Sequence, residues 1–349
     1  MSIPFPVRIQ AAVVRAVYAL PHGLRRAFAG KPEVRDGQTL ALDAQVILKF
    51  QRMSKATMVM PGGVGPSRDE MEHARHLVGG PRIEPVAVRE LGIPRERGET
   101  PARLYTPAGL GGASGLLVYV HGGGWAVGSL ESHDHVARFL AQRARVRVLS
   151  VGYRLAPEHP FPAGLEDVQA ALDYAFAKAV DLGVDPERIA VGGDSAGGNL
   201  AAVAVQEAVR RGGPVPVFQL LLYPVTDLST KRRSYQLFAE TYFLTSDNMD
   251  WFADRYAPEP LDRTDPRISP LLAADLAGLP PTYLSTAGFD PLRDEGEAYA
   301  QALEAAGVEV YLSRQSDLIH GYANYIGVGH RFEDATAEAA EALRKALGC

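Results

Sequence analysis

The sequence predicts an α/β fold in which a mostly parallel β-sheet is flanked by helices, and two patterns indicate it. After residue 80, short β-rich runs alternate with stretches of helical periodicity, which is the order of elements that βαβ units produce. Several of the β-rich runs, such as residues 116–120 and 220–223, are apolar at every position. Strands that are covered by helices on both faces have this composition.

The candidate elements can be placed in order along the chain. Strands are expected over 86–91, 102–106, 115–121, 146–153, 188–192, 218–223, 282–286 and 308–313. Helical patterns lie between the later strands, near 133–143, 164–180, 197–211, 294–306 and 331–347. The first strands follow one another without a helix, which predicts an antiparallel start to the sheet.

The first 80 residues are predicted to form helices and loops, with the clearest helical pattern over 38–55. Ser67, with Glu70 three residues later, resembles a capping box that opens a helix over 68–78. We therefore expect a small helical region ahead of the sheet.

A second helical segment interrupts the alternation of strands and helices at 225–279, with helical patterns near 234–240 and 246–257. Connections this long between two strands are usually functional, often as a lid or a binding element. The aromatic residues of this segment are therefore expected to line or cover a binding pocket.

Length, composition and charge narrow the class of protein. The chain has 349 residues, of which 46% are hydrophobic and 22% charged, as in a globular protein with a large core. The net charge of −5 gives no reason to expect a nucleic-acid partner. The single cysteine is Cys349, so a disulfide within the chain is excluded and a cytoplasmic location is expected.

The N-terminal segment is basic. Residues 1–32 contain no acid and five basic residues, which are Arg8, Arg15, Arg25, Arg26 and Lys31. A signal peptide would place its charge before an unbroken apolar core, whereas Arg15 falls inside the apolar stretch. We expect a helix that packs on the rest of the protein, with no stable membrane insertion. The alternative is a basic amphipathic helix that makes peripheral contact with a membrane surface.

The strongest chemical signal is the sequence G-D-S-A-G at 193–197, which has the form G-x-S-x-G. It follows an apolar strand and precedes an alanine-rich helix, which is the context that a nucleophile elbow requires. The sharp turn exposes the hydroxyl of Ser195, and the helix behind it directs amides toward developing negative charge. Ser195 is therefore the predicted nucleophile.

A second signal is H-G-G-G-W at 121–125, directly after another predicted strand. Acyl transfer needs backbone amides directed at the oxyanion of a tetrahedral intermediate. Consecutive glycines allow the backbone to present such amides, and the residue after the nucleophile supplies another. The predicted oxyanion donors are therefore the amides of Gly123, Gly124 and Ala196.

The base and the acid are sought downstream of the serine, in the order Ser…Asp/Glu…His. Of the nine histidines only His320 and His330 follow Ser195, and His320 lies in a loop just after the last predicted strand. Asp290 follows the preceding strand, where parallel sheets assemble their sites. His320 is the predicted base and Asp290 the predicted acid, with Asp317 as the rival acid.

The sequence H-D-H at 133–135 contains residue types that bind metals, but a helix without a metal site is the preferred interpretation. Residues two positions apart on a helix diverge, and the spacing fits no zinc pattern. Ser132 resembles the N-cap of the helix that follows. No metal is predicted.

Four motifs in the right order together resemble the hormone-sensitive lipase family of α/β-hydrolases, in particular its bacterial carboxylesterases. They are H-G-G-G-W at 121–125, Y-R-L-A-P-E at 153–158, G-D-S-A-G-G-N at 193–199 and D-P-L-R-D-E at 290–295. One departure is Tyr322, where phenylalanine is usual in the family. The resemblance covers about residues 85–345, and residues 1–80 contain no matching motif.

The resemblance implies an α/β-hydrolase fold with a mostly parallel eight-stranded sheet and a helical cap. The catalytic core is expected at 81–224 and 280–349, and the cap at 1–80 and 225–279. The implied activity is hydrolysis of short- to medium-chain acyl esters through an acyl-enzyme, without a cofactor. The predicted substrate-binding residues are Trp125, Tyr242, Phe243 and Trp251.

Other functions use the same fold. An amide hydrolase, a lactone hydrolase or a deacetylase would need the same triad, because the pocket selects the leaving group. A non-catalytic receptor on this fold has lost the catalytic histidine, whereas this chain keeps His320. A membrane-associated lipase is a third alternative, for which the basic N-terminus is the argument. The sequence does not decide whether the chain forms a homodimer.

Overall fold

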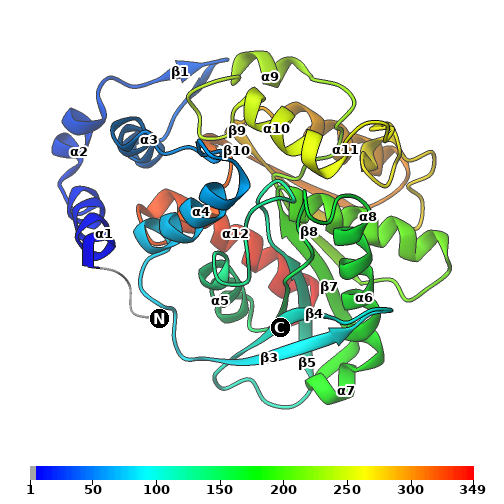
Figure 1. Cartoon of the computed structure of the whole chain (residues 1–349). Coiled ribbons are helices and arrows are strands. Elements are labelled where there is room, and N and C mark those ends of the chain that lie inside the picture. Colours follow the sequence, from blue (N-terminus) through cyan, green and yellow to red (C-terminus); the bar gives the residue numbers. More distant parts are fainter. Residues whose placement is uncertain (1–4) are drawn as a thin grey trace.

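The computed structural model describes residues 5–349 and is built around one eight-stranded sheet (Figure 1). The strand order is β10-β9-β8-β7-β5-β6-β4-β3, with β3 and β4 antiparallel to their neighbours and the remaining pairs parallel. The predicted mostly parallel sheet with an antiparallel start is therefore confirmed. The strands are β3 (Val86–Pro94), β4 (Glu99–Pro107), β5 (Ser114–Val120), β6 (Arg147–Val151), β7 (Val184–Asp194), β8 (Phe218–Leu222), β9 (Thr282–Phe289) and β10 (Val310–Ile319).

The last strand is longer than predicted. The strand is expected to end at residue 313, yet β10 continues in parallel register with β9 as far as Gln315 and pairs again at Ile319. Polar side chains are tolerated here because the strand lies at the edge of the sheet. The extension brings the chain to the same edge at which the neighbouring strands end.

Helices cover both faces of this sheet. The helices that follow the start of the sheet are α5 (Asp134–Ala144), α6 (Ala163–Ala177), α7 (Ala179–Leu182), α8 (Ala196–Arg210), α11 (Arg293–Ala305) and α12 (His330–Ala346). Buried residues of α6, α8 and α11 belong to one hydrophobic core, and those of α5 and α12 belong to the other.

The central strand β5 shows why two cores form. Its side chains alternate between the faces, so that Leu116 and Val118 pack into one core while Leu117 and Tyr119 pack into the other. Because both faces are covered, all seven residues of β5 are buried. The uninterrupted apolar run in the sequence has this cause.

The N-terminal helices lie together at one side of the sheet in Figure 1, in blue. The elements there are α1 (Phe5–Tyr18), α2 (His22–Ala29), β1 (Val34–Arg35), β2 (Gln38–Thr39), α3 (Leu42–Ser54) and α4 (Val64–Val78). Val7, Ala11 and Val14 form the buried stripe of α1, and α1 packs on α4 and α3. None of the helices within residues 5–349 is both long enough and apolar enough to cross a membrane.

The segment between β8 and β9 is also helical. It contains α9 (Arg233–Leu237), α10 (Ser246–Tyr256) and the short 3-10 turn η1 (Pro270–Leu272), near the positions that the sequence predicts. Thr245 caps α10, and Asn248 completes a capping box there. Another 3-10 turn, η2 (Tyr322–Tyr325), precedes α12.

Two predicted helix caps are wrong. The helix predicted over 68–78 begins at Val64, where Gly63 is the N-cap with a φ of 93°. Ser67 lies inside that helix, and its hydroxyl donates to the Gly63 carbonyl (2.8 Å) and accepts from the Met60 amide (2.9 Å). A serine inside a helix that binds the preceding turn and a serine that caps a helix occur in the same local sequence pattern, so the sequence does not distinguish them.

Ser132 is the other wrong cap. The N-cap of α5 is His133, which makes no side-chain capping bond. The hydroxyl of Ser132 accepts instead from the Ser129 amide at 2.8 Å and so closes the turn before the helix. Serine favours both positions for the same reason, since its hydroxyl competes for nearby amides.

Candidate active site

The sharp turn at the end of β7 presents Ser195. Asp194 is the last residue of the strand and Ala196 the first residue of α8, so Ser195 alone makes the turn between them. Its φ of 55° and ψ of −119° are unusual for a residue with a side chain. Its amide donates to the Leu222 carbonyl of β8 (2.9 Å). The strained turn holds the hydroxyl at the carboxyl edge of the sheet.

The structure brings Ser195, His320 and Asp290 together. Nε2 of His320 lies 2.9 Å from Oγ of Ser195, and Nδ1 of His320 lies 2.7 Å from Oδ2 of Asp290. His320 follows the end of β10, and Asp290 follows the end of β9. Three nonadjacent segments therefore meet because parallel strands end at one edge of the sheet.

The two rival residues lie elsewhere. Asp317 is held by Arg331, whose Nη2 lies 2.7 Å from its Oδ1. His330 begins α12. The acid and the base that the sequence favours are thus the ones that reach Ser195.

Burial and hydrogen bonding fix the orientation of the triad. Asp290 is fully buried, and its second oxygen Oδ1 accepts from the Leu292 amide (2.9 Å). The edge of Tyr223 packs on the imidazole of His320, with 4.9 Å between ring centroids. Ser195 keeps 7% of its surface exposed and lines a cavity. The acid is therefore sealed in the protein while the serine stays open to a ligand.

Tyr322 stands where the family usually has phenylalanine, and its hydroxyl is accommodated. It lies 2.7 Å from Oγ of Ser285 on β9, and both groups are buried. The ring packs edge-on against Tyr223, the neighbour of the catalytic imidazole. The departure therefore adds a hydrogen bond behind the triad and leaves the triad geometry in place.

The glycine loop after β5 approaches the same point. Gly123 lines the cavity, with a φ of 117°, and Gly124 has a φ of 56°. A Cβ on Gly124 would lie 2.2 Å from Cγ of Phe252, so no larger residue fits there without moving that ring. Within the described chain, the amides of Gly123, Gly124 and Ala196 donate to no protein acceptor. Amides left free beside the serine are what an oxyanion requires.

Asp194 anchors this loop to the elbow. Its Oδ1 accepts from the Tyr119 hydroxyl (2.6 Å) and from the Gly122 amide (2.9 Å). Burial alone would raise its pKa, but His133 and these two donors lower the pKa of Asp194 to about 2. The carboxylate is thus ionised at neutral pH and ties the glycine loop to the residue before Ser195. Nothing in the sequence of the elbow indicates this role of Asp194.

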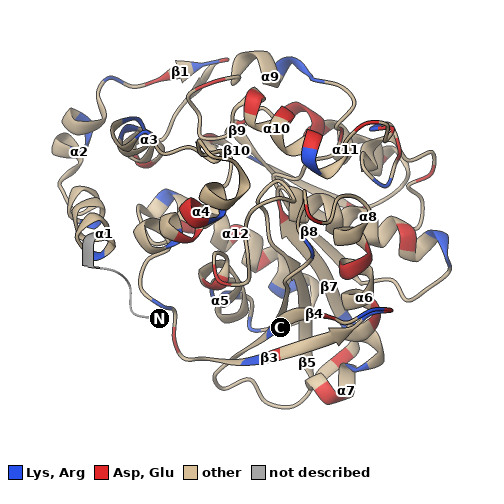
Figure 2. Ribbon diagram, in the orientation of Figure 1, with Lys and Arg blue, Asp and Glu red and all other residues tan. Residues whose placement is uncertain are grey.

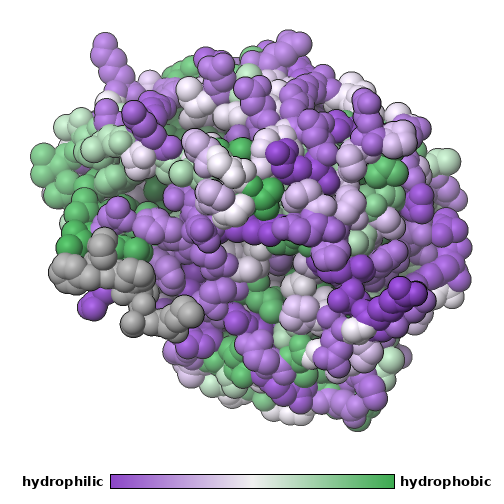
Figure 3. Space-filling view, in the orientation of Figure 1, coloured by the Kyte–Doolittle hydropathy of each residue, from purple (hydrophilic) through white to green (hydrophobic). Residues whose placement is uncertain are grey.

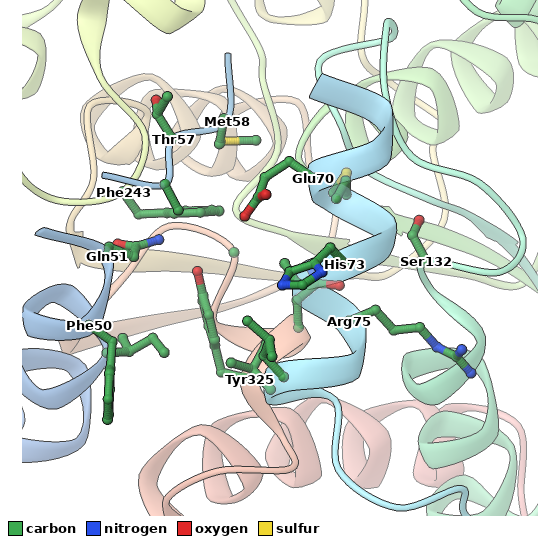
Figure 4. Close-up of a pocket in the computed structure, with 18 of the residues that line it drawn as sticks. Phe50, Gln51, Thr57, Met58, Glu70, His73, Arg75, Ser132, Phe243 and Tyr325 are labelled. Carbon is green, nitrogen blue, oxygen red and sulfur yellow. The ribbon is translucent and has the colours of Figure 1, made fainter. Parts of the chain in front are cut away.

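A cavity of about 490 Å³ opens in front of Ser195, which is a volume typical of small-molecule sites. Figure 4 shows Glu70 and His73 extending from α4 toward Phe243 and Tyr325. Most of the apolar wall comes from the N-terminal helices and the loop that joins α3 to α4. These apolar wall residues are Ile9, Val13, Val14, Ile47, Phe50, Ala56, Met58, Met60, Met71, Ala74, Leu77 and Val78.

Of the four aromatic residues predicted to bind substrate, only Phe243 lines this cavity. Trp125 is buried and stacks on Tyr256, with 4.3 Å between ring centroids. Tyr242 is buried against other aromatic rings and donates its hydroxyl to Glu33. Trp251 lies under the guanidinium of Arg255, 3.6 Å from the ring centroid. The prediction that these three line the cavity does not match their positions.

The walls supplied by α4 are what sequence reasoning missed. Residues 67, 70, 71, 73, 74, 75, 77 and 78 all line the cavity, and the spacing of most of them is that of one helix face. The periodicity was visible in the sequence. It could not show that this face meets the serine, because the first 80 residues contain no motif.

Glu70 brings a carboxylate into a mostly apolar wall. Partial burial raises the pKa of Glu70, and the nearby His73 opposes this change. In residues 5–349 no hydrogen bond or ion pair engages the carboxylate of Glu70. Its charge is therefore free to act on whatever occupies the cavity.

The histidines at 133 and 135 have separate surroundings. Nε2 of His133 lies 3.6 Å from Oδ2 of Asp194, whereas Nε2 of His135 lies 3.0 Å from the Asn324 carbonyl. Among the residues that the structure describes, no three His, Cys, Asp or Glu side chains are grouped as metal ligands.

The strand order, the strained serine turn and the hydrogen-bonded Ser-His-Asp arrangement define a serine hydrolase with the α/β-hydrolase fold. A sequence model described as the alpha/beta hydrolase fold matches residues 117–324. The chain belongs to the hormone-sensitive lipase family of α/β-hydrolases. Within that family it is a serine carboxylic ester hydrolase.

Particular relatives are similar over most of their length. The chain is 45% identical to carboxylic ester hydrolase LipN of Mycobacterium tuberculosis, over 97% of this chain and 93% of that protein. It is 40% identical to an ethyl acetate hydrolase of Pseudomonas putida, over 80% and 90% respectively. Among solved structures, the hyperthermophilic esterase of Pyrobaculum calidifontis is 37% identical with a TM-score of 0.80, over 86% of this chain and 97% of that one.

Proposed function

We propose that Ser195, His320 and Asp290 hydrolyse carboxylic esters in two steps through an acyl-enzyme. The observation that carries the proposal is the row of hydrogen bonds from Asp290 through His320 to Ser195, of 2.7 and 2.9 Å, which ends at a cavity. A nucleophile, a base and an orienting acid in this geometry are the parts that the reaction needs.

In the first step, Oγ of Ser195 attacks the ester carbonyl while Nε2 of His320 takes the hydroxyl proton. The tetrahedral oxyanion accepts hydrogen bonds from the amides of Gly123, Gly124 and Ala196. His320 then gives the proton to the leaving alcohol, and the ester C–O bond breaks. Asp290 orients the imidazole and stabilises its charged form without taking the proton.

In the second step, water replaces the alcohol. His320 takes a proton from the water, whose oxygen attacks the acyl carbonyl, and returns the proton to Ser195 as the acid leaves. All reacting groups belong to the chain, the substrate or water, so the proposal includes no cofactor.

The proposed substrates are esters of short to medium acyl chains. The cavity of about 490 Å³ supports this, and so does the name of the relative that hydrolyses ethyl acetate. The aromatic ring of Phe243 belongs to the cavity wall, whereas Trp251 lies outside it. Phe243→Ala should therefore shift the preferred acyl length upward, and Trp251→Ala serves as the matched control with an unchanged profile.

We also propose that residues 1–80 and 225–279 form the two parts of a cap over the core at 81–224 and 280–349. The N-terminal part supplies most of the apolar cavity wall, while the insertion supplies Phe243. The proposed compartment is the cytoplasm, which the single cysteine supports.

The test is a set of initial rates on p-nitrophenyl esters from acetate to palmitate, for the native chain beside Ser195→Ala. A maximum at short or medium chains that Ser195→Ala abolishes is the expected result. Hydrolysis that survives in Ser195→Ala would overturn the mechanism. A folded native chain that cleaves p-nitroanilides or lactones but no ester would overturn the substrate class, and binding without turnover would favour a receptor.

A further inference from the structure

Helices α1 and α2 expose apolar side chains that the fold does not cover. Ile9 and Val13 are each 50% exposed, Leu24 is 56% exposed and Leu20, between the two helices, is 37% exposed. Figure 3 shows green, hydrophobic atoms gathered over the region that α1 and α2 occupy in Figure 1. We call these four residues the apolar rim.

The apolar rim is separate from the face by which α1 packs. Val7, Ala11 and Val14 are buried and attach α1 to the protein, as expected for a packed helix. A helix with one buried stripe normally has a polar outer face. Here the exposed residues of α1 include Ile9 and Val13 beside the arginines, and contacts within the fold leave half of each apolar side chain uncovered.

Cations surround the apolar rim. Helices α1 and α2 carry blue and no red in Figure 2, in agreement with the absence of any acid before Glu33. Arg25 and Arg26 are engaged inside the fold by Asp43 and Gln45. Across the described chain, by contrast, the side chains of Arg8, Arg15 and Lys31 form no ion pair or hydrogen bond, and all three are exposed. Exposed apolar residues flanked by unneutralised cations are the signature of an interfacial helix.

The apolar rim also borders the entrance to the active site. Ile9 and Val13 are half exposed, yet both line the cavity that contains Ser195. A surface in contact with α1 would therefore meet the opening through which substrate passes.

We propose that α1 and α2 seat the cavity mouth on an anionic lipid surface, from which ester substrates enter the site. The proposal rests on the esterase function above and adds the source from which substrate comes. The rim supplies the apolar contact, and Arg8, Arg15 and Lys31 supply attraction to anionic headgroups.

A second copy of the chain fits this face less well. A two-fold interface places the same patch on both sides, so Arg8 and Arg15 would face the partner's arginines, and neither α1 nor α2 carries an acid to offset them. Anionic lipid neutralises these cations, whereas self-association concentrates them. Charge complementarity therefore selects lipid.

The experiment is co-sedimentation of the full chain with vesicles of phosphatidylcholine, with and without phosphatidylglycerol, at low and high salt. The charge variant is R8Q/R15Q, and the apolar variant is L20S/L24S, which avoids residues that line the cavity. The matched controls are Val180→Ser, which alters an 86% exposed valine on the distant helix α7, and Arg89→Gln, which alters an exposed arginine on β3. Thermal melting verifies that each variant is folded.

The native chain should bind the anionic vesicles, and high salt should weaken this binding. R8Q/R15Q should lower the partition coefficient roughly thirtyfold, about fivefold per arginine, and L20S/L24S should lower it too. Both controls should bind as the native chain does. Hydrolysis of soluble p-nitrophenyl acetate should be unchanged in R8Q/R15Q and L20S/L24S, while their rates on vesicle-borne esters fall.

Equal binding to neutral and anionic vesicles, or unchanged binding by both variants, would overturn the proposal. A dimer in sedimentation equilibrium that L20S/L24S dissociates would identify a second copy as the occupant and would also overturn it. Ser195→Ala should bind vesicles normally without hydrolysing ester. The lipid contact and the proposed esterase chemistry can therefore fail separately.

Discussion

Replacing Asp290 by asparagine should remove most of the activity without unfolding the site, and the hydrogen bonds show why. The Leu292 amide donates to one carboxylate oxygen, and Nδ1 of His320 faces the other at 2.7 Å. The asparagine oxygen must accept from the fixed amide, which leaves its NH2 group facing Nδ1. The imidazole then carries its proton on Nε2 and can no longer accept the proton of Ser195.

The expected loss is about 10⁴-fold in kcat, or about 5 kcal/mol of barrier, the size seen when an orienting aspartate becomes asparagine in a serine protease. The assay is the pH profile of kcat and KM on p-nitrophenyl butyrate, beside a melting curve. Asp317→Asn is the matched control, because Asp317 pairs with Arg331 and does not touch the imidazole. Activity of Asp290→Asn within tenfold of the native chain, or an equal loss in Asp317→Asn, would refute this reasoning.

Three further predictions follow from the same geometry. Gly124→Ala should lower kcat by roughly 10²–10³-fold, because its Cβ would meet the Phe252 ring at 2.2 Å and displace an oxyanion donor; unchanged kcat on p-nitrophenyl butyrate would contradict this. Burial lowers the pKa of His121 and of His135 to about 3. Below the ordinary histidine pKa of about 6.5, these two residues therefore bind protons in the unfolded chain but not in the folded one, so the folded protein loses stability as the pH falls. The free energy of unfolding, measured with urea, should be lower at pH 5 than at pH 7 by about 2 kcal/mol for each of these histidines. A His135→Asn variant whose stability falls with pH as much as that of the native chain would contradict this prediction. Glu70→Gln should raise kcat/KM about fivefold for esters with a free carboxylate on the acyl chain, since like charges 4 Å apart repel by about 1 kcal/mol in water; a neutral ester of equal length should change less.

The sequence could predict the sheet because its strands are coded locally. The run at 116–120 is apolar at every position, and the structure buries both faces of β5. The end of β10 was less visible, because its polar residues 314 and 315 are extended through pairing with β9. Local composition predicts that a strand exists, while its length depends on the neighbour.

The triad could also be predicted, since each member directly follows a strand. Ser195 follows β7, Asp290 follows β9 and His320 follows β10, so the parallel arrangement itself brings them together. The cavity wall could not be predicted in this way. Trp125 and Phe243 are equally aromatic in the sequence, yet only the packing of Tyr256 against Trp125 shows which of them is buried away from substrate.

The cavity wall and the reacting groups come from separate parts of the sequence, and this separation affects how the enzyme can evolve a new substrate selectivity. The reacting groups occupy positions 195–320, whereas most of the apolar cavity wall is encoded between residues 9 and 78. Recombination within the first quarter of the gene therefore exchanges most of the apolar cavity wall and leaves the catalytic residues unchanged. Random mutagenesis limited to that contiguous stretch should yield altered selectivity at far higher frequency than the same mutational load spread over the whole gene.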